Sequence, residues 1–406
     1  MKRIGILGHG FIEWGGGLDF LRLICGSLVA ASEPVELHLL LPTRGPRLMA
    51  RRAIRHLKRI LGRPVIDSKR PDSRHIVELI SGEMRGRLSV HLIDIGSAAV
   101  NRAARRLNLD VLLPAHYAPR PSFHTPWLGY IADLQHVHFP QFFSPQEVAV
   151  RHRHCETMLN QARCVIVNAQ AVVDDIRNAY PNHATNIVAL PFAPAPSKEW
   201  LSAAAPPLDR YQISENYFII CNQFWQHKDH LTAWRAFAAL HDEFPDVQLV
   251  CTGETSDFRN PTHFELLKQE AQRLGISANL RILGLIPKHE QIALLRSALA
   301  VVQPTLFEGG PGGGAVFDAV ALGVPAIVSD ISVNLEVTDP AVCFFRQGDA
   351  EHLAQRMRDV LQRPARQPAT APELLAAGEQ RRRACGDVLI AAATQLRASP
   401  ARQHGQ

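Results

Sequence analysis

The sequence lacks the features that mark a membrane-spanning or secreted protein. No run of 18 consecutive apolar residues occurs among the 406 residues, so no membrane-spanning helix is predicted. Glycines interrupt the apolar start of the chain, and no small-residue cleavage site follows it. We therefore interpret this start as a buried strand rather than a secretory signal.

Paired cysteines are also missing. The seven cysteines are scattered, no two form a Cys-x-x-Cys pair, and most lie in apolar runs such as 164–169. A free cysteine in such a run behaves as a small hydrophobic residue. We expect neither a disulfide framework nor a zinc site, and a cytoplasmic location fits this pattern.

Basic residues exceed acidic ones only modestly, and the formal net charge is +6. The excess is concentrated in residues 43–63, which carry eight Arg or Lys, no acid, and apolar residues at helical spacing. Such a helix either lies on an anionic lipid surface, at the inner face of the cell membrane, or forms a solvated outer face. No nucleic-acid-binding module accompanies it, so nucleic acid is not an expected partner.

Short apolar runs alternate with longer helical patterns along the whole chain, as in α/β proteins with parallel sheets. Strands are predicted in the first half at 3–8, 35–41, 89–94, 110–115, 128–132, 164–169 and 186–191. In the second half they are predicted at 217–224, 247–253, 280–284, 299–304, 325–330 and 341–345. The sequence thus predicts two Rossmann-like, doubly wound domains that face each other across a cleft.

The domain boundaries follow from breaks in this alternation. A Pro- and Ala-rich stretch, 191–214, is the predicted linker between an N-terminal domain, 1–190, and a C-terminal domain, 215–372. A second break precedes a terminal helix at 373–397, which we expect to return to the N-terminal domain. Residues 398–406 are a predicted flexible tail.

The stretch 307–330 contains five glycines between Glu308 and Ala315, directly before a helical pattern. A glycine-lined helix N-terminus exposes unpaired backbone N–H groups and binds phosphate. Glu308 stands before the loop, at the end of a strand in our interpretation, and Asp318 lies one turn inside the helix. Because carboxylates accept hydroxyl donors, this pairing suits a nucleotide sugar, although such turns also serve close packing of helix on sheet.

Taken together, these motifs resemble the retaining GT-B glycosyltransferases, in particular glycosyltransferase family 4. The resemblance rests on residues 221–237, 280–310, the glycine loop with its helix, and 323–337. In the first half, 129–147 is similar to the family's histidine-aspartate segment, and a second glycine cluster, 15–17, to its N-terminal loop.

The resemblance implies a set of donor-binding residues. Lys228 occupies the position of a lysine on the donor diphosphate, whereas Gln223 stands where an arginine is usual. Glu308 matches the acid that contacts the transferred sugar, which makes it a catalytic candidate. Asp318 matches the acid that holds the ribose, with a spacing two residues longer than usual. The remaining donor-binding positions are Gly16, Gly17, Leu285, Ile286, Gly310, Gly312, Gly313 and Gly314.

On the N-terminal side the resemblance implies Asp133 and His116 as catalytic residues, although Ala132 replaces the family's histidine before Asp133. His136 and His138 are candidate sugar or acceptor contacts. The reaction implied is transfer of a hexosyl group, with retention, from a GDP- or UDP-sugar to a glycan or lipid-linked hydroxyl. No cofactor is expected to be tightly bound, and no metal, since no Asp-x-Asp triplet occurs.

Two alternatives stay open. A nucleotide-sugar epimerase of the same fold needs no acceptor. A catalytically inactive nucleotide-sugar-binding module that docks on membranes through 43–63 is favoured by Gln223 and Ala132, the two departures from the family pattern.

Overall fold

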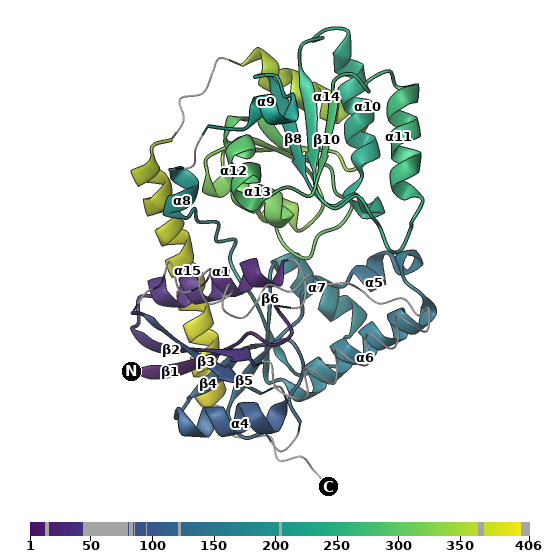
Figure 1. The fold of residues 1–406 in the computed structure, drawn as a ribbon. Helices are drawn as coiled ribbons and strands as arrows, with labels where there is room; N and C mark the ends of the chain where they lie inside the picture. The colour runs from purple at the N-terminus through teal and green to yellow at the C-terminus, as the bar shows by residue number, and fades with distance from the viewer. Residues whose placement is uncertain are drawn as a thin grey trace.

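Two parallel sheets, each covered by helices on both faces, form the computed structural model of the chain (Figure 1). The structure describes residues 1–12, 16–43, 80, 84, 86–94, 96–120, 123–202, 205–363 and 369–398. The cationic segment 43–63 lies outside the described residues apart from Thr43. None of the helices in the described ranges combines the length and hydrophobicity needed to cross a bilayer.

The first sheet has seven strands in the order β3-β2-β1-β4-β5-β6-β7. All its neighbouring strands pair in parallel, and its central strands are buried on both faces, which explains their continuous apolar sequences. The strands are β1 (Lys2–Leu7), β2 (Val35–Pro42), β3 (Leu88–Ile93), β4 (Val111–Ala115), β5 (Trp127–Tyr130), β6 (Cys164–Val167) and β7 (Asn186–Ala189).

The second sheet has six parallel strands in the order β10-β9-β8-β11-β12-β13. Its strands are β8 (Tyr217–Cys221), β9 (Gln248–Thr252), β10 (Leu280–Gly284), β11 (Ala300–Gln303), β12 (Ala326–Ser329) and β13 (Val342–Phe345). Every predicted strand is present in the structure. The predicted fold class, two doubly wound α/β sheets, is confirmed.

Helices connect the strands in both halves and cover the sheets. Those of the first half are α1 (Gly17–Ala30), α4 (Ser97–Arg106), α5 (Gln135–His138), η1 (Pro140–Phe142), α6 (Pro145–Gln161) and α7 (Gln170–Ala179). Two short helices, α8 (Lys198–Leu201) and α9 (Leu208–Tyr211), lie between the sheets in sequence. Those of the second half are η2 (Gln226–Lys228), α10 (His230–His241), α11 (His263–Arg273), α12 (Lys288–Ser297), α13 (Gly313–Ala321), η3 (Asn334–Glu336) and α14 (Ala350–Gln362).

The last helix, α15 (Ala371–Ala398), starts beside the second sheet and runs along the first, where it packs on α1 (Figure 1). The two helices approach closely because Gly386 has no side chain: a Cβ there would lie 2.0 Å from the Ser27 carbonyl oxygen. Cys385 and Leu389 join the apolar core of the first sheet. This helix therefore ties the end of the chain to its beginning.

Hydrogen bonds join the two halves on the side away from α15. The Glu336 carboxylate, in η3 of the second half, accepts the backbone N–H groups of Gln170 (2.9 Å) and Ala171 (2.7 Å) at the start of α7. Arg259 donates to the Gln135 side chain across the same boundary at 3.0 Å. Because Glu336 satisfies N–H groups that α7 leaves unpaired, it acts as a helix cap supplied by the other domain.

Replacing Glu336 by Gln should loosen this closed arrangement. The glutamine side chain has one acceptor oxygen, so its NH2 group would face the second backbone N–H, a donor against a donor. Charge-assisted hydrogen bonds worth about 1.5–3 kcal/mol would be lost. We expect a larger radius of gyration in small-angle scattering, with the unfolding transition little changed. Glu379→Gln, at an exposed carboxylate on α15, is the control. Identical scattering curves for both variants would contradict the role of Glu336.

Candidate active site

A cavity of about 490 Å³ lies between the two halves of the molecule. One wall comes from the first two turns of α1 and from the loops that follow β5 and β6. The other comes from η2, the start of α12, the glycine loop and α13. The cavity thus lies where the carboxyl ends of two parallel sheets meet, the usual place for a ligand in such folds.

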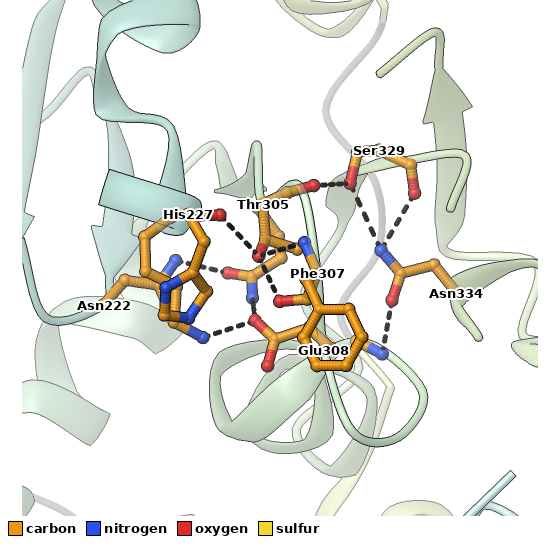
Figure 2. Close-up of polar contacts among 10 residues, drawn as sticks. Asn222, His227, Thr305, Phe307, Glu308, Ser329 and Asn334 are labelled. Carbon is orange, nitrogen blue, oxygen red and sulfur yellow. Dashed lines mark hydrogen bonds and ion pairs between the residues drawn. The ribbon is translucent and has the colours of Figure 1, made fainter. Parts of the chain in front are cut away.

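The glycine loop begins earlier than the sequence indicated. β11 ends at Gln303, so Glu308 lies in the loop and not at the end of the strand, which corrects our interpretation. The apolar residues after Gln303 suggest a longer strand, but the Thr305 hydroxyl donates to a loop carbonyl, that of Phe307, at 2.8 Å. Figure 2 shows this turn and the hydrogen bonds around it.

A buried polar network holds the loop in place (Figure 2). The Asn334 side-chain oxygen accepts the Gly312 N–H at 2.8 Å, and its amide nitrogen donates to the Ser329 carbonyl at 2.9 Å. The Ser329 hydroxyl in turn donates to the Thr305 carbonyl at 2.6 Å. Gly312 is buried and its N–H is used internally, so this glycine anchors the loop and does not line the cavity.

Two glycines of the loop allow the N-terminal half of the molecule to pack closely against it. A Cβ at Gly309 would lie 2.6 Å from the Ala132 carbonyl oxygen, and a Cβ at Gly310 would lie 2.7 Å from Cβ of Asn168. Asn168 also donates a hydrogen bond to the Gly309 carbonyl at 3.2 Å. Part of the glycine content is therefore explained by close packing of the domains.

The next two glycines face the cavity. Gly313 and Gly314 are the first residues of α13, and both line the cavity. No side chain in the described part of the chain caps this helix. A Cβ on Gly314 would meet no atom within 4 Å. A helix start carries N–H groups without an intrahelical partner and the positive end of the helix dipole, so this part of the cavity suits an anion.

Glu308 is held in the cavity wall by two donors. Lys228 Nζ lies 2.5 Å from Glu308 Oε1, and Gln303 Nε2 donates to the same oxygen at 2.9 Å. Asn222 orients Gln303 through a 2.6 Å hydrogen bond to its side-chain oxygen. The side chains of Lys228 and Glu308 are 10% and 11% exposed, so the pair is largely shielded from water. The sequence analysis did not identify Asn222 and Gln303. Polar residues at the ends of apolar strands are a pattern that could have indicated them.

Asp318 lines the cavity one turn into α13 and forms an ion pair with Lys288, the first residue of α12. Burial raises the pKa of the Asp318 carboxyl to about 6, and the Lys288 ammonium opposes this rise. The sequence analysis found Asp318 but not Lys288, which is one of several basic residues at helix starts and has no distinguishing pattern.

Gln223 is exposed and lines the cavity beside Lys228. It brings no charge to the position at which the family resemblance implies an arginine. His227, which the sequence analysis missed, also lines the cavity. Burial, with Lys228 and Arg259 nearby, lowers the pKa of His227 to about 2, so its imidazole is neutral.

On the N-terminal side the cavity is lined by Gly16, Ala132 and Asp133. Asp133 Oδ1 accepts the Gln135 N–H at 3.0 Å, which closes a turn after β5. Gly17 begins α1 and is buried, and it does not line the cavity.

The three candidate histidines lie outside the cavity wall. His116 follows β4 and packs on the backbone at Gly10, and burial lowers its pKa to about 4. His136 contacts the Tyr180 hydroxyl at 3.2 Å, and His138 pairs with Asp175 at 2.8 Å. A catalytic role for any of them stays a prediction that this arrangement does not support directly.

Leu285 and Ile286 follow β10 and also lie outside the cavity wall. Leu285 is 73% exposed, and Ile286 packs against the core of the second sheet. They precede Pro287 and Lys288 in the chain, and their role in donor binding stays a prediction.

The fold of this molecule is similar to that of several solved structures over nearly the whole chain. It is similar to sucrose-phosphate synthase from Thermosynechococcus elongatus, with a TM-score of 0.58, 17% identity and 97% of each chain covered. It is also similar to HepE from Anabaena in complex with UDP-glucose, with a TM-score of 0.58, 15% identity and 98% of each chain covered. WaaG, a glycosyltransferase involved in lipopolysaccharide biosynthesis, has a TM-score of 0.54 and 14% identity over 98% of this chain and all of that one.

These likenesses and the two facing parallel sheets define the fold as that of the GT-B glycosyltransferases. Residues 211–375 match the family described as "Glycosyl transferases group 1". This range includes Gln223, Lys228, Glu308, the glycine loop and Asp318. The C-terminal half of the chain is therefore similar to that family, and this similarity is one basis for the function proposed below.

Gly314 allows a direct test of the anion site. Gly314→Ala should not lower stability, because alanine favours a helix over glycine by about 1 kcal/mol and no atom lies within 4 Å. Gly314→Asp should also fold, since an acid is favourable at a helix start. We expect both to weaken nucleoside diphosphate binding in calorimetry, Asp more than Ala, with melting temperatures at or above the wild-type value. Unchanged affinity in both variants would place the phosphates elsewhere.

Proposed function

We propose that this protein transfers a hexosyl group from a nucleoside diphosphate sugar to a hydroxyl group of a glycan or lipid-linked acceptor, with retention at the anomeric carbon. The observation that carries the proposal is one cavity wall that combines free helix-start N–H groups at Gly313 and Gly314 with Lys228, Glu308 and Asp318. These groups match the parts of such a donor: phosphate, sugar and ribose.

In this proposal the diphosphate lies against the start of α13, and the Lys228 ammonium donates to it. Glu308 then exchanges part of its contact with Lys228 for sugar hydroxyls. Asp318 accepts the ribose hydroxyls. Gly16 and Asp133 close the cavity from the N-terminal side, which excludes water that would otherwise compete with the acceptor.

The chemistry requires the bond between the anomeric carbon and the diphosphate oxygen to break while the acceptor oxygen bonds to the same carbon. The acceptor proton moves to the departing diphosphate oxygen. Fixed N–H dipoles and Lys228 stabilise the negative charge that develops on that oxygen, which is the effect expected of preorganised donors. Glu308 stabilises the positive charge that develops on the sugar.

The donor class has support from the neighbours, since HepE is described in complex with UDP and with UDP-glucose. We propose a UDP- or GDP-hexose for this chain. The cationic segment 43–63 is the basis for proposing an acceptor at an anionic membrane surface.

A thermal-shift screen with GDP, UDP, ADP and dTDP, followed by turnover assays, tests the proposal. We expect one of these nucleotides to stabilise the protein, and Glu308→Gln to lower turnover by about 100-fold or more while nucleotide affinity stays near wild type. Glu265→Gln, at an exposed carboxylate on α11, is the control.

Three outcomes would contradict the proposal. Unchanged turnover in Glu308→Gln would remove Glu308 from the site. Interconversion of the donor sugar without an acceptor would indicate an epimerase. Nucleotide binding without hydrolysis or transfer across an acceptor panel would indicate an inactive binding module.

A further inference from the structure

Lys288 is fixed on two sides at the edge of the cavity. Its ammonium pairs with the Asp318 carboxylate, and it lies 5.5 Å from the centre of the Trp200 ring. Trp200 belongs to α8, and the Ser197 side chain caps this short helix at its start. Arg22, on α1 of the N-terminal half, lies on the same ring at 6.0 Å. Lys288 is therefore positioned by an aromatic contact as well as by the ion pair.

The Asp318 carboxylate needs a cation to remain charged. Its side chain is 6% exposed, and burial without compensation favours the neutral acid. The charged groups that face it are Lys288 from α12, and Asp19 and Arg22 from α1, whose effects oppose each other. The Cys221 thiol of β8 is also near, but burial raises its pKa to about 12 and leaves it neutral. Among the described residues, Lys288 alone forms an ion pair with Asp318.

The geometry leaves Asp318 able to accept further donors. The ion pair uses Oδ2, whereas no hydrogen bond is present at Oδ1 among the described residues. Asp318 is part of the cavity wall, and its Oδ1 is not among the buried atoms that lack a hydrogen-bond partner. A charged carboxylate with one oxygen held by Lys288 is ready to accept hydroxyl donors.

We propose that Lys288 is a positioning residue that keeps the Asp318 carboxylate ionised and oriented to receive the ribose hydroxyls of the donor nucleotide. This inference rests on the proposed function, because it takes a nucleoside diphosphate as the ligand. Lys288 acts through Asp318, and Trp200 keeps the ammonium in place when the ribose enters.

This role makes the nucleotide affinity depend on pH. The pKa of Asp318 is about 6 with Lys288 in place, and removal of the cation raises it further. Because the ribose hydroxyls need the ionised carboxylate as acceptor, nucleotide affinity should fall as the pH falls through this pKa, by up to about tenfold per pH unit. Without Lys288 the same loss begins at a higher pH. A lost structural contact alone would lower affinity equally at every pH.

The experiment measures affinity for UDP and GDP by calorimetry between about pH 5.5 and pH 9. It compares the wild type, Lys288→Met and Lys288→Arg, with Lys268→Met as a matched control at an exposed lysine on α11. Methionine keeps the apolar stem but removes the charge. We expect Lys288→Met to bind on the order of tenfold more weakly than wild type at pH 7, to recover at alkaline pH, and Lys288→Arg to retain the wild-type profile.

A 2′,3′-dideoxynucleoside diphosphate serves as the ligand control. It lacks the hydroxyls that would donate to Asp318, so its affinity should not depend on Lys288. Its pH dependence reports the titration of the terminal phosphate, whose pKa is about 6, and is subtracted from that of the ribonucleotide. A Lys288→Met profile parallel to that of the wild type, or a uniform loss at every pH, would overturn the inference. Failure of the wild type to bind any nucleotide at any pH would instead overturn the proposed function.

Discussion

The glycine loop has three roles that depend on its lack of side chains. Gly309 and Gly310 admit the N-terminal half of the molecule, Gly312 is tied to Asn334, and Gly314 leaves open space in front of α13. The first contact brings the two sheets together, the second sets the direction of the helix, and the third leaves N–H groups for a ligand. One short loop therefore closes one side of the cavity and also leaves room within it.

Two carboxylates in the cavity wall are each matched with one lysine. Lys228 pairs with Glu308 and Lys288 with Asp318, and the four side chains come from η2, the loop, α12 and α13. A buried carboxylate without a partner would lose its proton only at raised pH. In our proposal Lys288 keeps the Asp318 carboxylate charged. Both lysines hold their carboxylates in place until the sugar and ribose enter.

The sequence predicted the sheets well because parallel strands buried on both faces are continuous apolar runs, as at 217–224 and 280–284. It also indicated Glu308, Asp318 and the glycine loop, whose chemistry is visible locally. It missed Lys288 and Glu336, since a partner on another helix or domain is decided by packing and leaves no local pattern. His116 packs against Gly10 and lies outside the cavity wall, so its catalytic role stays a prediction.

The most direct test of the central claim is a crystal structure of the protein with its nucleoside diphosphate. The account predicts phosphate oxygens within hydrogen-bond distance, about 2.7–3.2 Å, of the Gly313 or Gly314 backbone nitrogen. It also predicts the ribose beside Asp318. A nucleotide bound away from α13, or a cavity filled by protein side chains in the presence of nucleotide, would contradict it.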